Sequence, residues 1–213
     1  MQIVLNFAEL LYLLKNAQSV EEIDSHREEI AVLIPAVRQM FDFDQKNHAH
    51  QYDLWMHCLH TVVGLSEEVT DDILYVAALL HDIGKPDCQV GGKREDDINM
   101  HYYGHPERSF EIVQNDVIPT LLKNGADMSA DEQRRLLYYV HYHDDRMGLR
   151  MHHVRRHMRI PVSLKEFKNL MRLQIADAKA HVLLPIVVKR VEICEQLAGA
   201  YGEELYQRIL NGE

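Results

Sequence analysis

The amino-acid sequence predicts an all-α protein built as a single helical bundle. Three observations favour this fold class. Capping-box patterns, in which Ser is followed three residues later by Glu, occur at Ser19, Ser129 and Ser163 and mark helix starts. Apolar residues recur at helical spacing, and no segment alternates convincingly between apolar and polar residues as a strand would. With 46% hydrophobic residues, a chain of 213 residues can bury a core without disulfides or a structural metal.

The first half of the chain predicts three helices after a short N-terminal one. The capping box at Ser19 opens a helix that runs to about Met40. One buried face of this helix consists of residues seven, four and three positions apart: Ile23, Ile30, Ile34 and Val37. A polar stretch at 42–51 ends this pattern, and the next helix begins near Asp53. The third runs from about residue 70 to Gly84, a residue type that suits a helix end.

The second half begins with a predicted loop from Gly84 to Gly104, and loops of this length are typically functional or mobile. Pro106 suits the first turn of a helix that ends near Gly125. Further predicted helices follow at 130–143, 151–159, 164–181, 186–199 and 203–211. Without an internal repeat or a long linker, the chain predicts one main domain. We divide it into an N-terminal helix that packs on the core, the main domain and a C-terminal helix, at 1–19, 20–199 and 200–213.

Composition excludes some classes of partner. The net charge of −10 argues against a surface for duplex nucleic acid, because such surfaces need clustered Lys and Arg. A small phosphorylated substrate stays compatible with this charge, since a bound metal supplies local positive charge. No stretch approaches the roughly 20 apolar residues of a membrane span. The cysteines lack a C-x-x-C pair and predict reduced thiols in a cytoplasmic protein: Cys58, Cys88 and Cys194.

Histidine is unusually frequent, with 14 residues. Several occur in pairs that are close in sequence: His48 and His50, His57 and His60, His101 and His105, His141 and His143, His152 and His153. Histidine is the commonest metal ligand and a ready acid or base near neutral pH. Others, such as His26 and His157, have charged neighbours and are expected on the surface.

The pair His81-Asp82 is the sharpest local feature. It follows the apolar run 75–80, which predicts a buried helix, and a buried His-Asp pair is costly unless something neutralises it. A metal is one solution. The alternative is that the two residues cap the helix and pair with each other.

Two further polar residues lie within apolar helical stretches. Taken alone, His57 stands among Leu54, Trp55 and Leu59, where a hydrogen-bonded core histidine is the better explanation. Asp177 lies near the end of the largely apolar stretch 170–178, and taken alone it is better explained as an acid that pairs with another helix. Taken together with His81-Asp82, they are best explained by one shared partner, a divalent metal bound by two imidazoles and two carboxylates.

The segment 77–86, with the sequence AALLHDIGKP, resembles the signature of the HD-domain phosphohydrolase superfamily. It is most similar to the HD region of the tRNA nucleotidyltransferase and poly(A) polymerase family. Supporting segments occur in the order of that family over roughly residues 20–195: 34–35, 45–48, 52–57, 103–105, 142–144, 154–156 and 176–178. No Gly-Ser motif followed by paired aspartates precedes residue 20, so we expect the hydrolytic module without the nucleotidyltransferase head.

The resemblance implies a fold, a single HD-domain helical bundle, and a metal site. The implied ligands of a divalent ion are His57, His81, Asp82 and Asp177. His105 and His143 correspond to positions that hold a second ion or contact the phosphate. His141 competes with His143 for this role, and the family's His-Asp pattern at 143–144 favours His143. One ion is expected, with a second at His105 and His143 left open; manganese, iron, cobalt, nickel and zinc all suit mixed nitrogen and oxygen ligands.

The implied activity is hydrolysis of a phosphate ester of a small nucleotide by metal-activated water. The substrate would be a 2′,3′-cyclic nucleotide or a nucleoside monophosphate. Asp82 and Lys85 belong to the catalytic set, with Lys85 either against the phosphate or solvated at the helix end. His105 or His143 could protonate the leaving oxygen. Arg146 and Arg155 are weaker candidates for a phosphate clamp, since surface charge explains them equally well.

Two rival functions stay open. The first is another enzyme of the same superfamily that acts on a nucleoside triphosphate or a signalling nucleotide. The second is a noncatalytic regulatory module that binds a nucleotide or RNA and keeps the metal as a structural element.

Overall fold

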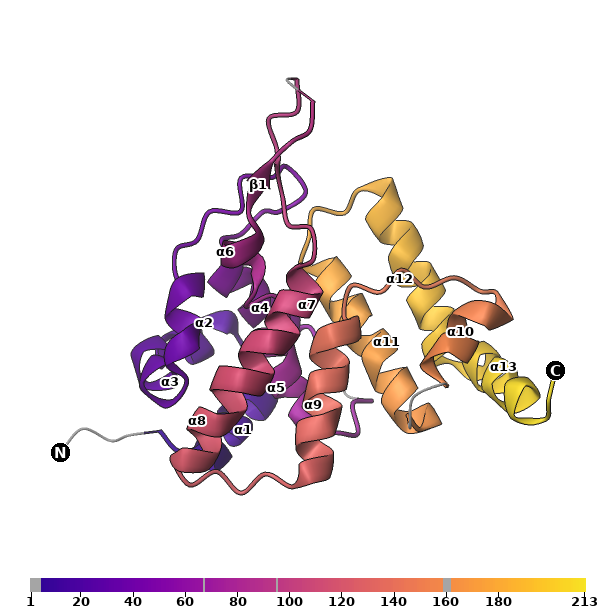
Figure 1. Ribbon diagram of the computed structural model, residues 1–213, viewed down its shortest axis with the longest axis horizontal. Helices are drawn as coiled ribbons and strands as arrows, with labels where there is room; N and C mark the ends of the chain where they lie inside the picture. The colour runs from indigo at the N-terminus through magenta and orange to yellow at the C-terminus, as the bar shows by residue number, and fades with distance from the viewer. Residues whose placement is uncertain (1–4, 67, 95, 159–161) are drawn as a thin grey trace.

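Helices make up most of the chain in the computed structural model, which describes residues 5–66, 68–94, 96–158 and 162–213 (Figure 1). The predicted all-α class is confirmed. Within these ranges the strands are β1 (Val90–Gly91) and β2 (Met100–His101), which form an antiparallel hairpin. The predicted absence of strands is wrong at this hairpin, and the predicted loop at 84–104 also contains the short helix α6 (Lys85–Cys88).

The N-terminal part contains α1 (Phe7–Asn16), α2 (Val20–Asp24), α3 (Arg27–Leu33) and the 3-10 helix η1 (Pro35–Met40). Residues 1–4 of the predicted segment 1–19 lie outside the described residues. The prediction of one continuous helix from Ser19 to Met40 is wrong. Pro35 has no backbone N–H and disfavours helical geometry at the residue before it, so Ile34 takes φ −127° and ψ 81°. The predicted buried face is confirmed: Ile23, Ile30, Ile34 and Val37.

Four helices position the centre of the molecule: α4 (Leu54–Val63), α5 (Ile73–Leu80), α9 (Ala130–Tyr142) and α11 (Leu164–Lys179). The Asp53 carboxylate caps α4 by accepting a hydrogen bond from the Met56 amide. The predicted capping boxes at Ser129 and Ser163 are both formed. Helix α5 is apolar on almost every side because it packs against both α4 and α9, and α11 packs against α4.

The remaining helices surround this centre. Helix α7 (His105–Ile112) continues through the π-helical turn η2 (Val113–Val117) into α8 (Ile118–Lys123). Gly84 lets α7 approach closely, because a Cβ atom there would lie 2.5 Å from the backbone nitrogen of Ser109. The Gly84 amide also donates a hydrogen bond to the Ser109 hydroxyl. The prediction that the helix runs to Gly84 is wrong, because α5 ends at Leu80 and Gly84 directly precedes α6; the role of this glycine is close helix packing.

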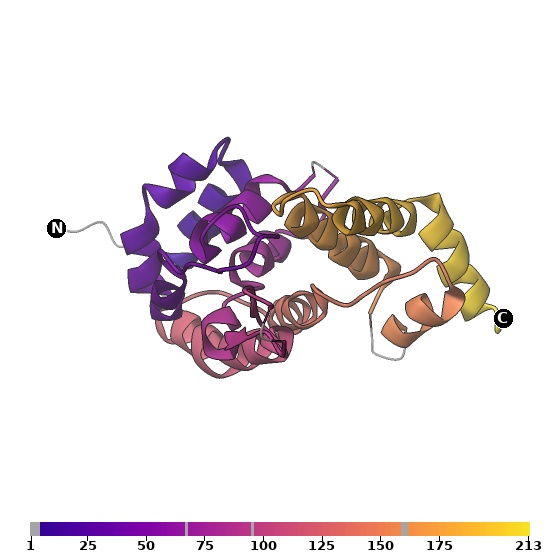
Figure 2. The ribbon, with the colours of Figure 1, turned by 90° about the horizontal axis from the view of Figure 1, so that it is seen from above.

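The C-terminal part contains α10 (Met151–His157), α12 (Pro185–Ala198) and α13 (Ala200–Leu210). Residue 159, the predicted end of the helix that starts at 151, lies outside the described residues. Figures 1 and 2 show the N-terminal and C-terminal helices at opposite ends of the long axis, with α5 and α9 between them. In the described part of the chain, every helix is too short or too polar to cross a membrane.

Candidate metal centre

Four side chains from three helices meet below the surface of the central bundle. His57 lies on α4, His81 and Asp82 follow the last turn of α5, and Asp177 lies near the end of α11. Each offers one nitrogen or oxygen atom, and these atoms all lie within 4.8 Å of one another. All four side chains are buried. We call these four residues the mixed cluster, because it combines imidazole nitrogens with carboxylate oxygens.

The facing atoms of the mixed cluster lie close together without hydrogen-bond geometry. His57 Nε2 lies 3.1 Å from Asp177 Oδ1, and His81 Nε2 lies 3.3 Å from Asp82 Oδ2. Among the described residues, four buried atoms of the cluster lack a hydrogen-bond partner: His57 Nε2, His81 Nε2, Asp82 Oδ1 and Asp177 Oδ1. Leaving a buried polar group without a partner costs roughly 1–3 kcal/mol. Atoms that converge in this way fit a divalent cation with mixed nitrogen and oxygen ligands.

The ring orientation of His81 supports the same fit. Its Nδ1 atom lies 2.8 Å from the Ala78 carbonyl oxygen, which can only accept a hydrogen bond, so Nδ1 carries the proton. In the neutral ring, the lone pair of Nε2 therefore faces the cluster. Metal-binding histidines in proteins are usually fixed in this way by a hydrogen bond from the other ring nitrogen.

A second group of possible ligands shares Asp82. The Asp82 Oδ1 atom lies 3.1 Å from His105 Nε2 and 3.2 Å from His143 Nε2. Both rings donate from Nδ1 to a carbonyl oxygen, that of Tyr102 for His105 and that of Val140 for His143. The two oxygens of Asp82 thus face two different groups of ligands, and one carboxylate can serve both. His141 lies elsewhere, with its Nδ1 atom 3.6 Å from the Glu107 carboxylate.

Lys85 lies in the buried part of the site. Its Nζ atom is 2.6 Å from Asp82 Oδ2 and donates a hydrogen bond to the side-chain oxygen of Gln45 at 2.9 Å. The alternative that Lys85 is a solvated cation at the helix end is wrong, because the side chain is 4% exposed. Burial alone would lower the pKa of Lys85, but the Asp82 carboxylate raises it above its ordinary value. Lys85 therefore stays charged beside Asp82.

Both carboxylates of the mixed cluster are ionised. Burial alone would raise their pKa values, yet Lys85 holds the pKa of Asp82 well below its ordinary value. His181 and other nearby groups have the same effect on the pKa of Asp177. Burial lowers the pKa of His143, which keeps this imidazole neutral near neutral pH. Burial alone would lower the pKa of His81, but the Asp82 carboxylate raises it well above its ordinary value, so this ring carries a proton on Nε2 that it releases when a metal binds.

Arg190 on α12 is a site residue that sequence reasoning missed. Its guanidinium donates hydrogen bonds to the His143 carbonyl at 2.8 Å and to the Asp144 carboxylate at 3.1 Å, and it lies 3.6 Å from Asp177. It therefore ties the end of α9 to α11 and α12. The sequence gives no signal for this role, since Lys189 and Arg190 read as ordinary helix-surface charge.

The two predicted arginines lie in different places. Arg146 lines the cavity above the mixed cluster, whereas Arg155 donates hydrogen bonds to Met151 and to the carbonyl of Glu213 and is not among the residues that line it. This position does not support Arg155 as a phosphate clamp.

An open cavity of about 430 Å³ gives access to the centre. Asp82, Asp177 and Lys85 lie in its lining, and one wall comes from residues 101–106, at the base of the hairpin and the start of α7. His50 and His181, which the sequence analysis did not single out, also line it. Burial and the nearby charge of Lys85 lower the pKa of His50 to about 2, and burial lowers the pKa of His181 to about 4. The cavity volume suits a small ligand.

Comparison with known proteins gives one match. The family described as HD domain matches residues 53–180, more than half of the chain. The matched range runs from the residue that caps α4 to the end of α11, and it contains the mixed cluster. His50, His181 and Arg190 lie outside it. The chain matches no curated protein and no solved structure.

Proposed function

The chain belongs to the HD domain family, and from this premise we propose that it hydrolyses a phosphate ester of a small nucleotide with the help of a divalent metal ion. The observation that carries the proposal is the convergence of two imidazoles and two carboxylates below an open cavity, with one buried atom of each lacking a hydrogen-bond partner among the described residues. A purely structural polar network would pair these atoms with one another.

The mixed cluster would hold the ion, and Asp82, His105 and His143 would hold a second one if two are bound. A divalent ion at such a site lowers the pKa of bound water and polarises a phosphoryl oxygen. The ligand set does not select among manganese, iron, cobalt, nickel and zinc.

The chain's own residues supply the remaining functions. Lys85 orients the Asp82 carboxylate through their 2.6 Å contact and keeps a positive charge on the cavity wall, where a phosphate would lie. His105 is less buried than His143, and when its ring carries a second proton, on Nε2, it could deliver that proton to the leaving oxygen if no second ion is bound. Arg190 holds the His143 backbone in place, and Arg146 can contact a phosphate from the cavity wall.

The proposed substrate class follows from size, charge and resemblance. A cavity of about 430 Å³ accommodates a mononucleotide more readily than a polynucleotide, and the net charge of −10 argues against duplex nucleic acid. The similarity of residues 77–86 to the HD region of the tRNA nucleotidyltransferase family supports a 2′,3′-cyclic nucleotide or a nucleoside monophosphate. A cytoplasmic location and the division at 1–19, 20–199 and 200–213 belong to the same proposal.

The test combines metal analysis with a substrate panel. Metal-free protein is reconstituted with each candidate ion and assayed on 2′,3′-cyclic nucleotides, nucleoside monophosphates and nucleoside triphosphates. We expect turnover of at least one of the first two classes. Asp177→Asn should reduce it by more than about 100-fold, since it removes a ligand but leaves the Lys85–Asp82 pair intact. His141→Ala is the matched control and should retain activity, because His141 faces Glu107.

Hydrolysis of nucleoside triphosphates alone would contradict the proposed substrate class but would still show that the protein is an enzyme. A protein that binds the metal and a nucleotide with no turnover of any substrate would contradict the enzymatic proposal. That result would favour the regulatory module.

A further inference from the structure

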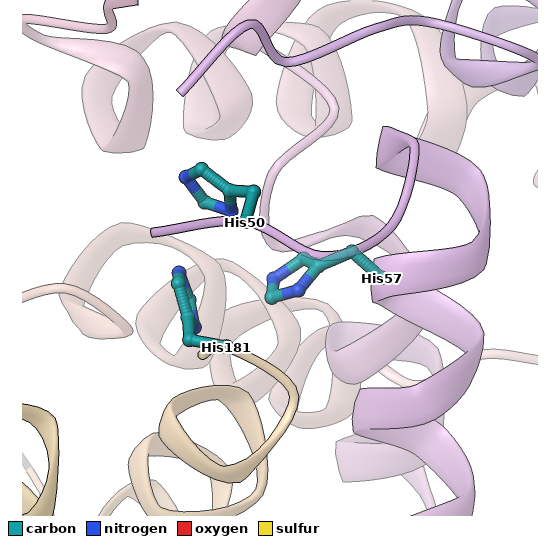
Figure 3. Close-up of side chains that lie close together, drawn as sticks. All are labelled: His50, His57 and His181. Atoms are coloured by element: carbon teal, nitrogen blue, oxygen red, sulfur yellow. The ribbon is translucent and has the colours of Figure 1, made fainter. Parts of the chain in front are cut away.

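Three histidine rings meet at one side of the mixed cluster (Figure 3). His50 comes from the loop before α4, His57 from α4 itself, and His181 from the residues just after α11. The ring centroids of His181 lie 4.5 Å from His50 and 4.7 Å from His57, and those of His50 and His57 are 5.7 Å apart. One ring nitrogen of each lies within 4.8 Å of the others. We call this group the histidine trio.

His181 has the ring orientation of a metal ligand. Its Nδ1 atom lies 2.8 Å from the Asp177 carbonyl oxygen, so it carries the proton and leaves the lone pair on Nε2. His81, His105 and His143 are fixed in the same way, each by a carbonyl oxygen three residues earlier. A histidine outside the range matched by the HD domain family therefore shares the orientation of the candidate ligands inside it.

His50 supplies an unpartnered nitrogen. Its Nδ1 atom is buried and has no hydrogen-bond partner among the described residues. The ring is half-buried and packs against the rings of His57 and His181, so these imidazoles lie together without a hydrogen bond that would explain their proximity within the described chain. Buried polar groups arranged in this way call for a partner.

The donor set of the trio differs from that of the two groups already described. The mixed cluster and the Asp82–His105–His143 group each contain a carboxylate, whereas the trio offers nitrogen alone. Imidazole nitrogen suits late first-row ions, while manganese and magnesium prefer carboxylate, carbonyl and water oxygens. Three histidines with an open fourth position are a well-known arrangement for zinc.

We propose that His50, His57 and His181 form a separate cation position that binds a late first-row divalent ion, namely nickel, copper or zinc. The trio shares His57 with the mixed cluster. When both positions are filled, His57 would bridge the two ions as an imidazolate, with one ring nitrogen on each ion and its proton released to solvent. Lys85 and Arg190 line the same cavity, and the trio has no carboxylate to offset their positive charges, so it is the weaker of the two positions. This inference concerns metal binding alone and stands whether or not the protein hydrolyses nucleotides.

The test counts ions bound by the full chain. Metal-free protein is titrated with Ni²⁺ and, separately, with Mn²⁺ by calorimetry, and bound metal is measured after dialysis. We expect one more equivalent of Ni²⁺ than of Mn²⁺. His50→Ala and His181→Ala should each remove that extra equivalent of Ni²⁺ and leave the Mn²⁺ stoichiometry unchanged.

Two controls separate the trio from surface histidines. His141→Ala removes a histidine that faces Glu107 and belongs to none of the three groups, and His152→Ala removes one of the adjacent pair His152 and His153. Both should keep the extra equivalent. Equal numbers of Ni²⁺ and Mn²⁺ in the unaltered protein would overturn the proposal, as would an extra equivalent that survives His50→Ala. If His181→Ala also loses Mn²⁺, His50→Ala decides, because His181 lies 3.5 Å from the Asp177 carboxylate, whereas His50 belongs to the trio alone.

Discussion

Two regions that bury histidine next to aspartate differ in how their polar atoms are satisfied. In the mixed cluster, the facing atoms of His57, His81 and Asp177 have no hydrogen-bond partner among the described residues. The second place is the contact between α9 and α10, where His157 is as buried as His57. There each ring nitrogen has a partner, the Tyr138 hydroxyl at 3.0 Å and the Asp145 carboxylate at 2.9 Å.

This difference in hydrogen bonding distinguishes a metal site from a structural polar network. Burial of a His-Asp contact is common to both, so burial alone does not identify a ligand set. In the His157 network, Asp145 accepts from His157 Nε2, and the Tyr138 hydroxyl can then donate to Nδ1. In the mixed cluster, the two carboxylates face the His57 and His81 rings without hydrogen-bond geometry, an arrangement that a divalent cation between them would relieve. The predictions below test this contrast with matched substitutions.

The largest expected effect comes from replacing one aspartate in each place. Asp177→Asn should weaken metal binding and turnover by more than about 100-fold, because it removes a charged ligand. Asp145→Asn should change neither, because Asp145 contacts His157 and Arg156 and is outside the three groups of ligands. Calorimetric titration with metal measures the affinity of each variant for the ion, and a nucleotide hydrolysis assay measures its turnover. Equal losses in the two variants would contradict the contrast.

Stability should respond in the opposite way. His157→Phe leaves the Tyr138 hydroxyl and the Asp145 carboxylate without their shared partner, and we expect it to lower the free energy of unfolding by roughly 2–3 kcal/mol. His81→Phe is the matched control. It should cost the metal-free protein less, because it breaks one hydrogen bond, from Nδ1 to the Ala78 carbonyl, whereas His157→Phe breaks two. Urea denaturation of both variants without metal measures the difference; a larger loss for His81→Phe would contradict it.

The next effect is the loss of folding stability when the metal is removed. An ion that binds only the folded state adds about 2.7 kcal/mol of stability when its free concentration is 100 times its Kd. The unaltered protein and the His157→Phe variant should both show this increase on addition of metal. Asp177→Asn should not show it at the same metal concentration. Thermal denaturation with metal and with a chelator measures the increase, and an equal increase in Asp177→Asn would place the ion elsewhere.

Much of the fold could be predicted from local sequence. The capping boxes at Ser129 and Ser163 form as expected because the Ser and Glu side chains are only three residues apart. The hairpin of β1 and β2 could not be predicted, since long-range contacts hold it in place. The Met100 amide donates to the Lys46 carbonyl, and the Asn47 side chain donates to the Met100 carbonyl. Strands of two residues leave no pattern of alternation in the sequence.

The candidate site was predictable where a polar residue interrupts an apolar helix. His57 and Asp177 were recognised on this basis. His50 and His181 were not, because they lie beside helix ends, where a histidine is unremarkable. The surface prediction for His157 is wrong for a related reason. Its neighbours Arg155 and Arg156 are charged, but the helical turn directs His157 toward Tyr138 while the arginines face outward.

The smallest expected effect is on the pH dependence of stability in the His157 network. Burial alone would raise the pKa of Asp145, but His157 and Arg156 lower it below its ordinary value. A carboxylate with a lowered pKa in the folded state stabilises the fold above its unfolded pKa of about 3.9, and this contribution is lost as pH falls through the folded value. The destabilisation caused by Asp145→Asn should therefore be full at pH 6 and shrink below about pH 4.

Urea denaturation of the unaltered protein and of Asp145→Asn at pH 6, 4 and 3 measures this trend. The difference in the free energy of unfolding between the two proteins cancels the other carboxylates, which titrate in both. A difference that stays constant from pH 6 to pH 3 would mean that the Asp145 charge contributes nothing to the network. The contrast with the mixed cluster would then rest on the hydrogen bonds of the His157 ring alone.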